Sequence, residues 1–281
     1  MENEFILLSI ALIILVIWLK RGVGRETDDK HKVKSAQSWR KEAVGNMKIN
    51  DYADIFDYWQ DSNLTRLEES CFEQDVHKED LPFLTAKMAE EKGAKLSFDF
   101  KGRIPSPWDG NLKSAKIVIC YANPLSDVDD VNNKAKMLKQ LSGSASLPTD
   151  IRAWNDWYEE KKFGRLGAFK NSNTISVFNV CPYASENMSD INWRVASCLP
   201  SVWWAQKHLR EVLIPMALDK EIFLVIARAH KYWGIPSWDH IDLFKEGNLR
   251  IQTNRGGFIQ EDIARDFMTW EDSDYGSDYK S

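Results

Sequence analysis

Four short apolar runs, separated by longer segments with helical periodicity, follow one another along the chain. They cover residues 115–122, 174–181, 222–227 and 249–253. Their length and their β-branched residues are typical of strands that are buried on both faces, as in a parallel sheet. Strands that alternate with helical segments imply crossover connections. The pattern predicts an α/β fold, a three-layer α/β/α domain with a mostly parallel four-stranded sheet.

The helices expected in the crossovers cover residues 132–141, 150–162 and 201–218. Residues 35–95 have a similar periodicity, which predicts a helical N-terminal extension over 35–109, with a half-exposed strand at 96–100. The α/β domain is expected over 110–270. Residues 271–281 are acidic and lack apolar periodicity, so they are predicted to form a disordered tail.

An unbroken apolar run from Phe5 to Leu19 lies near the amino terminus. As a helix it would span about 22 Å, which is short for a bilayer unless flanking residues contribute. Acidic residues precede the run and basic residues follow it, unlike a cleaved signal peptide. The run predicts a transmembrane anchor over 1–22, a linker over 23–34, an external amino terminus and a cytoplasmic carboxyl-terminal domain. The alternative is a buried core helix. The run is apolar on all faces, which disfavours this alternative.

The net charge, the cysteine spacing and the absence of two motifs limit the classes of function that the sequence supports. The formal net charge of −5 is unusual for a nucleic-acid coat, although phosphate binding depends on where Lys and Arg lie. The four cysteines form no C-x-x-C pair, which indicates free thiols in a reducing compartment. Neither a Walker loop nor a Gly-x-Gly-x-x-Gly sequence follows the first apolar run. We therefore predict no cofactor and no metal site.

Polar residues follow several of the predicted strands directly. The first run ends at Asn123, which precedes Pro124, and Asn179 lies near the end of the second run. The fourth run is closed by Asn254 and Arg255. Ligands of open parallel sheets bind at the carboxyl ends of the strands. The sequence therefore predicts a site at this edge of the sheet.

These strand ends resemble those of the uracil-DNA glycosylase superfamily, over roughly residues 110–270. The sequence Tyr-Ala-Asn-Pro at 121–124 is similar to the Asn-Pro form of the loop that holds the water-activating residue in the mismatch-specific branch. Asn179 is similar to the residue that reads the base. The segment 225–234 is similar to the third strand with the following helix, and 253–257 takes the place of the fourth loop.

The chain departs from the family pattern at three points. Ala122 replaces the glycine before Asn-Pro, Leu125 follows Pro124, and the His-Pro-Ser or Asn-Pro-Ser signature is absent. The resemblance implies a fold that tolerates these changes. It leaves open whether any reaction occurs.

The resemblance implies specific roles for individual side chains. Asn123 would orient a water, because an amide cannot act as a general base near neutrality, and Asp127 would supply a carboxylate. Asn179 would pair with a base edge, and Tyr121 or Tyr183 would stack on an extruded base. The phosphate-facing rim would consist of Arg228, His230, Lys231 and Arg255, and Asn254 would also bind the substrate.

Each of these residues also has a plain structural alternative. Asn123 can be a turn residue, Asp127 a helix-capping residue, and Asn179 a partner of loop backbone. The function expected from the resemblance is a membrane-anchored, nucleobase- or nucleic-acid-binding domain that hydrolyses an N-glycosidic bond. A noncatalytic nucleotide or nucleic-acid sensor on the same fold is the alternative, and an anchored scaffold without a pocket is a third.

Overall fold

The computed structural model describes residues 52–67, 74–90, 98, 103–124, 133–227, 229–235, 247–252 and 257–278. The predicted anchor and linker, over 1–34, lie outside these residues. Among the helices that are described, none combines the length and the apolar character that a membrane crossing requires.

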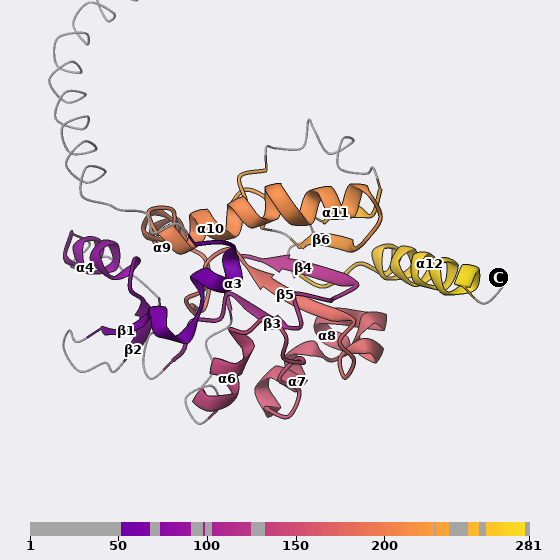
Figure 1. Cartoon of the computed structure of the whole chain (residues 1–281), viewed down its shortest axis with the longest axis horizontal. Helices are drawn as coiled ribbons and strands as arrows, with labels where there is room; N and C mark the ends of the chain where they lie inside the picture. Colours follow the sequence, from indigo (N-terminus) through magenta and orange to yellow (C-terminus); the bar gives the residue numbers. More distant parts are fainter. Residues whose placement is uncertain are drawn as a thin grey trace, which may run out of the picture. The chain divides into compact units, whose positions relative to one another are not determined.

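A five-stranded, mostly parallel sheet forms the centre of the fold (Figure 1). Its order is β3-β5-β4-β6-β7. The strands are β3 (Trp108–Gly110), β4 (Ile117–Tyr121), β5 (Ile175–Asn179), β6 (Phe223–Ala227) and β7 (Leu249–Gln252). Strand β4 pairs in parallel with β5 and β6, and β6 pairs in parallel with β7. The mixed α/β fold and all four predicted strands are confirmed.

The fifth strand, β3, corrects the expectation of four. It pairs antiparallel with β5, with Trp108 opposite Phe178 and Gly110 opposite Ser176. Pro105 and Pro107 precede it, and proline is more typical of loops than of strand interiors. A three-residue strand has no periodicity of its own, so only its pairing with β5 reveals it.

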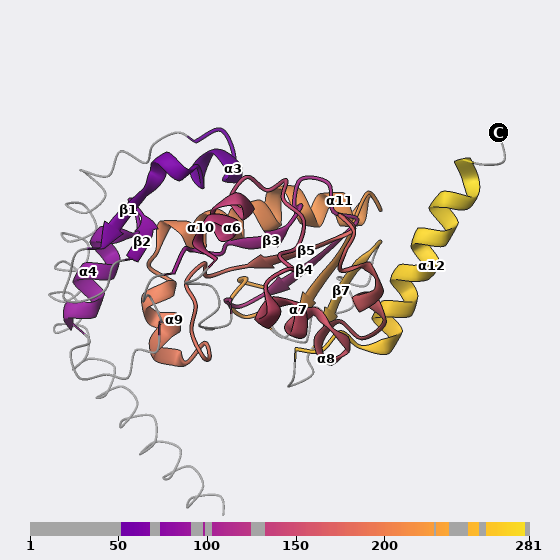
Figure 2. The same ribbon diagram turned by 90° about the horizontal axis from the view of Figure 1, so that it is seen from below.

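Helices cover both faces of this sheet, which explains why every residue of β4, β5 and β6 is buried. Helices α10 and α11 lie on one face, and α6, α7 and α8 lie on the other (Figures 1 and 2). The described helices are α3 (Ile55–Tyr58), η1 (Asp61–Asn63), α4 (Leu81–Glu90), α6 (Lys134–Gln140), α7 (Arg152–Tyr158), α8 (Glu160–Phe163), η2 (Gly164–Phe169), α9 (Asp190–Ala196), α10 (Pro200–His208), the π-helical turn η3 (Leu209–Leu213), α11 (Ile214–Leu218) and α12 (Glu261–Asp278). The three predicted crossover helices are thus confirmed.

The residues before the sheet are only partly helical, contrary to expectation. Strands β1 (Leu64–Leu67) and β2 (Gln74–His77) form an antiparallel pair where a helix was predicted. Helix α3 stops after one turn because the Asn63 amide donates hydrogen bonds to the carbonyl oxygens of Asp57 and Tyr58. Of the strand expected at 96–100, the described part is Phe98, which forms a single bridge to Ser185.

The carboxyl-terminal helix α12 corrects the predicted tail, since it continues through Asp278. Its buried residues include Ile263 and Phe267. The Glu271 carboxylate lies 3.7 Å from the Lys116 ammonium, beside the sheet. Helix propagation costs little once a packed segment has nucleated it, so polar residues beyond the packed turns extend the helix. The described part of Tyr52–Ser281 forms one compact unit, and β3 spans the expected boundary at 109/110.

Candidate functional site

An open cleft of about 410 Å³ lies at the carboxyl ends of β4 and β6. From β4 the chain crosses to β5, whereas from β6 it crosses to β7 on the opposite side. The connections therefore diverge between β4 and β6, which is the position where open α/β sheets bind ligands. The described lining residues that carry polar or aromatic side chains are Tyr121, Asn123, Trp157, Lys162, Ser185, Glu186, Asn187, Lys231 and Tyr232.

Tyr121, the last residue of β4, joins the cleft to the segment after β7. Its phenol donates a hydrogen bond to the Gly257 carbonyl oxygen at 2.9 Å. Its ring lies edge-on to Trp157, with the centroids 5.2 Å apart. Burial raises the pKa of the Tyr121 phenol, so it stays protonated and remains a donor. The predicted base-stacking residue thus lines the cleft, but it is largely buried in the wall.

The Asn123 side chain has a fixed orientation. Its Nδ2 donates to the carbonyl oxygens of Pro124 and Ser185, at 2.9 and 3.0 Å, and lies 3.0 Å from the Ser185 hydroxyl. Because carbonyl oxygens accept only from the nitrogen, the amide cannot be reversed. Among the described residues, no group donates to Oδ1. Asn123 therefore offers an acceptor, the atom that a water-orienting role requires.

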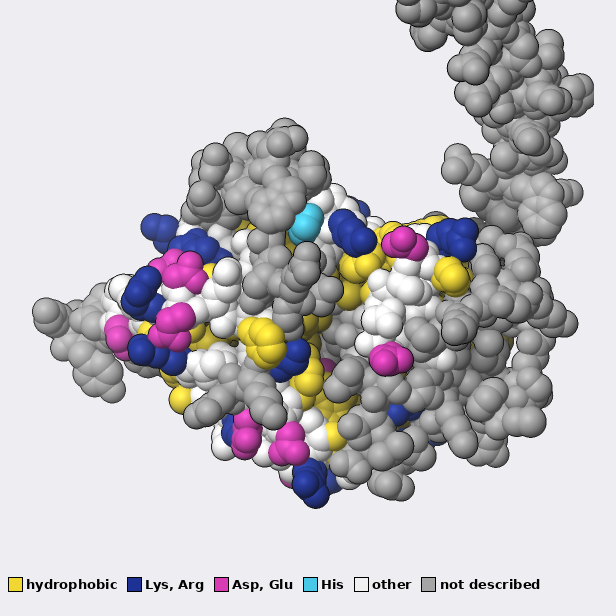
Figure 3. Space-filling view, turned by 180° about the vertical axis from the view of Figure 1, so that it is seen from behind, with side chains coloured by type: hydrophobic (Ala, Val, Ile, Leu, Met, Phe, Trp, Pro, Cys, Tyr) yellow, Lys and Arg dark blue, Asp and Glu magenta, His cyan; other side chains and the backbone are white. Residues whose placement is uncertain are grey.

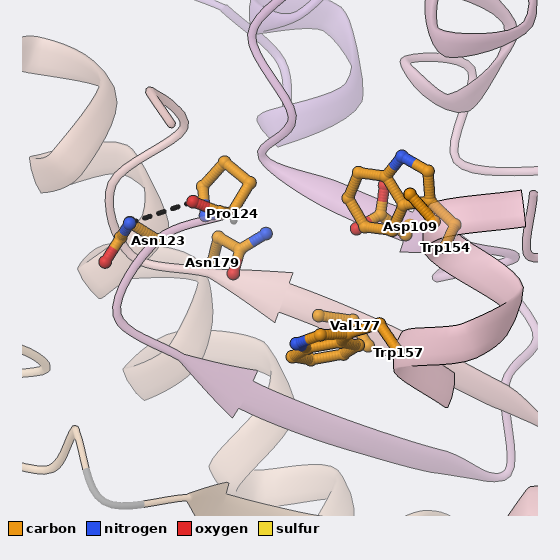
Figure 4. A pocket seen from close by; sticks show the side chains of 8 residues that line it. Asp109, Asn123, Pro124, Trp154, Trp157, Val177 and Asn179 are labelled. Atoms are coloured by element: carbon orange, nitrogen blue, oxygen red, sulfur yellow. Dashed lines mark hydrogen bonds between the residues drawn. The ribbon is translucent and has the colours of Figure 1, made fainter. Parts of the chain in front are cut away.

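A small cavity of about 20 Å³ adjoins the cleft, between α7 and the sheet. Asn123 and Asn179 both line it, together with Asp109 and the indoles of Trp154 and Trp157 (Figure 4). The two asparagines predicted from separate strands thus border one hollow. In Figure 4 the Asn123 amide turns away from Asn179, which lies between Pro124 and Trp157.

Asn179 is almost fully buried at the end of β5. Its side-chain nitrogen donates to the Ser106 carbonyl oxygen at 3.0 Å, and its backbone nitrogen donates to the Pro107 carbonyl oxygen at 2.8 Å. It therefore supports the loop before β3, as the structural alternative proposed, and also lines the small cavity.

Asp109 is a site residue that the sequence did not indicate. Its side chain is completely buried, and Oδ1 accepts a hydrogen bond from the Ser106 hydroxyl at 2.8 Å. A single Asp between Trp108 and Gly110 carries no recognisable signal. Its place opposite Val177, in the wall of the small cavity, follows only from the pairing of β3 with β5.

Tyr183 lies outside both hollows in the described structure, which corrects its predicted stacking role. Its hydroxyl donates to Asp80 Oδ2 at 2.6 Å and accepts from the His77 backbone nitrogen at 3.2 Å. It lies in the core, where the loop after β5 meets the residues that follow β2. An extruded base would not reach it without unpacking that core.

Two lysines lie at the rim of the cleft. The Lys231 ammonium lies 4.7 Å from the centre of the Tyr232 ring, and the Lys162 ammonium lies 4.5 Å from that of Phe258. His230 is half-buried beside Lys231. The remaining predicted site residues, Asp127, Arg228, Asn254 and Arg255, fall outside the described residues.

Hydrogen bonds hold the Tyr232 turn in place. The Tyr232 hydroxyl donates to the Met188 carbonyl oxygen at 2.8 Å, and Gln206 on α10 donates to the Tyr232 carbonyl oxygen at 2.7 Å. These contacts join the loops that follow β5 and β6. Lys162 reaches the cleft from a position far from the predicted strand-end motifs, so no sequence signal indicated it. Tyr232 lies within the segment 225–234 that the resemblance covers, but it was not among the predicted site residues.

The surface charge of the described residues is mixed. On the face seen in Figure 3, Lys and Arg side chains alternate with Asp and Glu side chains, without a broad basic patch. Within the described ranges, no group of three or more His, Cys, Asp or Glu side chains is arranged to hold a metal ion. The chain matches no family model, no curated protein and no solved structure.

Proposed function

We propose that this protein is a nucleobase- or nucleic-acid-binding domain of the glycosylase type, tethered to a membrane by residues 1–22 and facing the cytoplasm. The cleft between β4 and β6 carries the proposal. It combines aromatic rings, an amide acceptor and two ammonium groups in a volume of about 410 Å³, which suits a single nucleotide.

Each group in the cleft matches one part of a nucleotide. Base stacking on Trp157 or Tyr232 would offset the few kcal/mol, roughly, that extruding a base from a strand costs. Lys162 and Lys231 would face phosphate oxygens, which attract compact cations. Asn123 would contact a polar group of the nucleotide that lies between the base and the phosphate.

The proposed reaction is hydrolysis of an N-glycosidic bond. Its transition state resembles an oxocarbenium ion and needs little covalent help, so a positioned water contributes much of the catalysis. The Oδ1 atom of Asn123 would accept a hydrogen bond from that water and hold it toward the sugar. The bond between the sugar and the base nitrogen breaks, and the base leaves with the bonding electron pair. Asp127, which follows Asn123 by four positions in the sequence, would accept the proton that the attacking water gives up.

Incubation of the full-length chain with single-stranded DNA that contains uracil or another altered base tests this reaction. We expect abasic sites, detected as strand breaks after alkali treatment. Asn123→Ala should reduce the rate by about 100-fold or more, within the range for a lost transition-state contact. Lys139→Ala on α6 is a control outside the cleft. If no base is released from any strand, the enzymatic proposal is wrong.

A noncatalytic sensor is the second candidate, because the Asn123 amide also has a structural task. All of its donor contacts hold the Pro124 and Ser185 backbone or hydroxyl, which is the behaviour of a loop-fixing residue. Tight binding of a nucleotide without turnover would favour this function over hydrolysis.

A further inference from the structure

The Tyr232 ring has a fixed position at the wall of the cleft. Its hydroxyl donates a hydrogen bond to the Met188 carbonyl oxygen at 2.8 Å, and its backbone carbonyl oxygen accepts one from Gln206 Nε2 at 2.7 Å. The ring also packs against the Trp193 indole, with the ring centroids 4.7 Å apart. These partners belong to the loop after β5, to α10 and to α9, so three separate elements hold this residue.

The Lys231 ammonium lies over this fixed ring, 4.7 Å from its centre. At this distance the face of an aromatic ring attracts a cation. Within the part of the chain that the structure describes, no carboxylate pairs with Lys231. The Lys207 ammonium provides a contrast, because it lies 4.8 Å from the centre of the Trp204 ring but also 3.9 Å from the Glu211 carboxylate. The charge of Lys231 thus remains for a ligand, and the ring limits the directions that the side chain adopts.

The charges of the cleft favour an anionic ligand group. The described lining residues with charged side chains are Lys162, Lys231 and Glu186, so one positive charge is in excess. Lys162 belongs to α8, Glu186 to the loop after β5 and Lys231 to the turn after β6. A phosphate monoester carries about −1.5 to −2 charges near pH 7. Lys231 is therefore the ammonium that meets such a group on the β6 side of the cleft.

We infer that Tyr232 is a positioning residue, which holds the Lys231 ammonium as the phosphate contact of the cleft, and that the ligand is a phosphorylated nucleotide and not a nucleoside. The inference rests on the proposed function and specifies its substrate class. A lysine that a ring already orients loses less side-chain freedom when it binds a phosphate oxygen. The ring face over which Lys231 lies is not available to a base at the same time, so the base stacks on Trp157.

Calorimetric titration of the full-length chain with two pairs of ligands tests the substrate class. CMP and cytidine share the base and the sugar and differ by the phosphate, and so do AMP and adenosine. We expect the monophosphate of each pair to bind at least about 10-fold more tightly. Equal or tighter binding of the nucleosides would overturn the inference and leave the proposed function standing. Absence of binding by all four would overturn the nucleobase site itself.

Substitutions at Tyr232 separate positioning from a general structural role. Tyr232→Phe keeps the ring over which Lys231 lies, so it should keep most of the preference for the phosphate, measured as the ratio of the two dissociation constants. Tyr232→Leu removes the ring and should lower this ratio by about 3-fold or more, as should Lys231→Gln. A merely structural role of Tyr232 would weaken both members of a pair equally. An unchanged ratio in Tyr232→Leu would therefore overturn the positioning role.

Lys207→Gln is the matched control, because Lys207 also lies over an aromatic ring but is not among the residues that line the cleft. We expect its ratio to equal that of the unchanged protein, and circular dichroism checks that every variant is folded. If Tyr232→Leu does not fold, Tyr232→Met provides the same comparison, since a flexible side chain fills irregular space without a ring.

Discussion

A buried polar cluster joins the residues around β2 to the core of the domain. Asp80 accepts hydrogen bonds from the Tyr183 hydroxyl at 2.6 Å and from the Ser201 backbone nitrogen at 3.0 Å. His77 stacks on Tyr58 and its Nε2 lies 2.9 Å from the Tyr58 carbonyl oxygen. These side chains satisfy backbone groups that would otherwise be buried unpaired. Their role is structural, although the sequence analysis predicted that Tyr183 stacks on an extruded base.

The shifted pKa values of His77, His208 and Asp80 lead to a prediction of how the free energy of unfolding depends on pH. Burial lowers the pKa of His77 and of His208 from 6.5 to about 4. Their contribution to stability is therefore complete above pH 6.5 and is lost as the pH falls toward 4, because the unfolded chain binds more protons. Burial raises the pKa of Asp80 from 3.8 to about 6. Its contribution is complete below pH 3.8 and is lost as the pH rises through 6.

Two histidines outweigh one carboxyl group, so we expect the free energy of unfolding to decrease on acidification from pH 6.5 to 4. Asp80→Asn removes the opposing contribution and should make this decrease steeper, by at most about 1.4 kcal/mol per pH unit. Urea unfolding between pH 4 and 7 measures it. Asp150→Asn, at an exposed ion pair, should leave the slope unchanged. A slope that Asp80→Asn does not alter would contradict the assignment.

At the scale of single elements, the short strand β3 is hard to predict from the sequence and is closely fitted against β5. It ends at Gly110, whose φ of +89° lies in the region that favours glycine. A Cβ atom there would lie 2.7 Å from the Ile175 carbonyl oxygen, at the start of β5. The close approach of two backbones therefore fixes the position of β3, and with it that of Asp109.

Gly110→Ala should displace β3 and strongly destabilise the domain, by about 2–5 kcal/mol from the left-handed backbone and the steric overlap together. Gly164→Ala is a matched control: its φ is +54°, but the nearest atom to a Cβ there, the Ile259 carbonyl oxygen, lies 3.8 Å away. The control should lose only about 1–2 kcal/mol. Thermal and urea unfolding of both variants measure the difference, and equal losses would show that the contact with Ile175 does not matter.

At the scale of the whole molecule, the elements of the fold and the proposed anchor come from different parts of the sequence. The described residues of Tyr52–Ser281 form one compact unit, and the sheet, the cleft and the small cavity all lie within it. The apolar run at 5–19 precedes this unit in the sequence. Folding and membrane attachment should therefore be separable by deletion.

Deletion of residues 2–22 should release the protein from membranes while leaving its secondary structure intact. Alkaline carbonate extraction should retain the full-length chain in the membrane pellet and release the deleted form, because about 15 apolar residues bind a bilayer far more strongly than surface charges do. Circular dichroism of the deleted form should show the same helix and strand signals. Extraction of the full-length chain by carbonate would disprove the anchor.

Sequence reasoning was most successful where the physical signal is local. Residues 117–121 and 223–227 form strands that are buried on both faces of the sheet. A continuous apolar run of this length is recognisable in the sequence alone. The helix predicted over residues 64–67 was wrong, because leucines at helical spacing are also compatible with a strand. Its pairing with Gln74–His77 decided between them.

The sequence by itself determined the four parallel strands and the loops at their carboxyl ends, because periodicity records which residues must leave water. Only the tertiary structure decided which loops share a hollow. Asn123 and Asn179 are 56 positions apart in the sequence and line one cavity, which Asp109 on β3 also lines. Tyr183 lies in the core, where it donates a hydrogen bond to Asp80. Strand order and hydrogen-bond partners depend on contacts between distant segments, and local patterns do not encode such contacts.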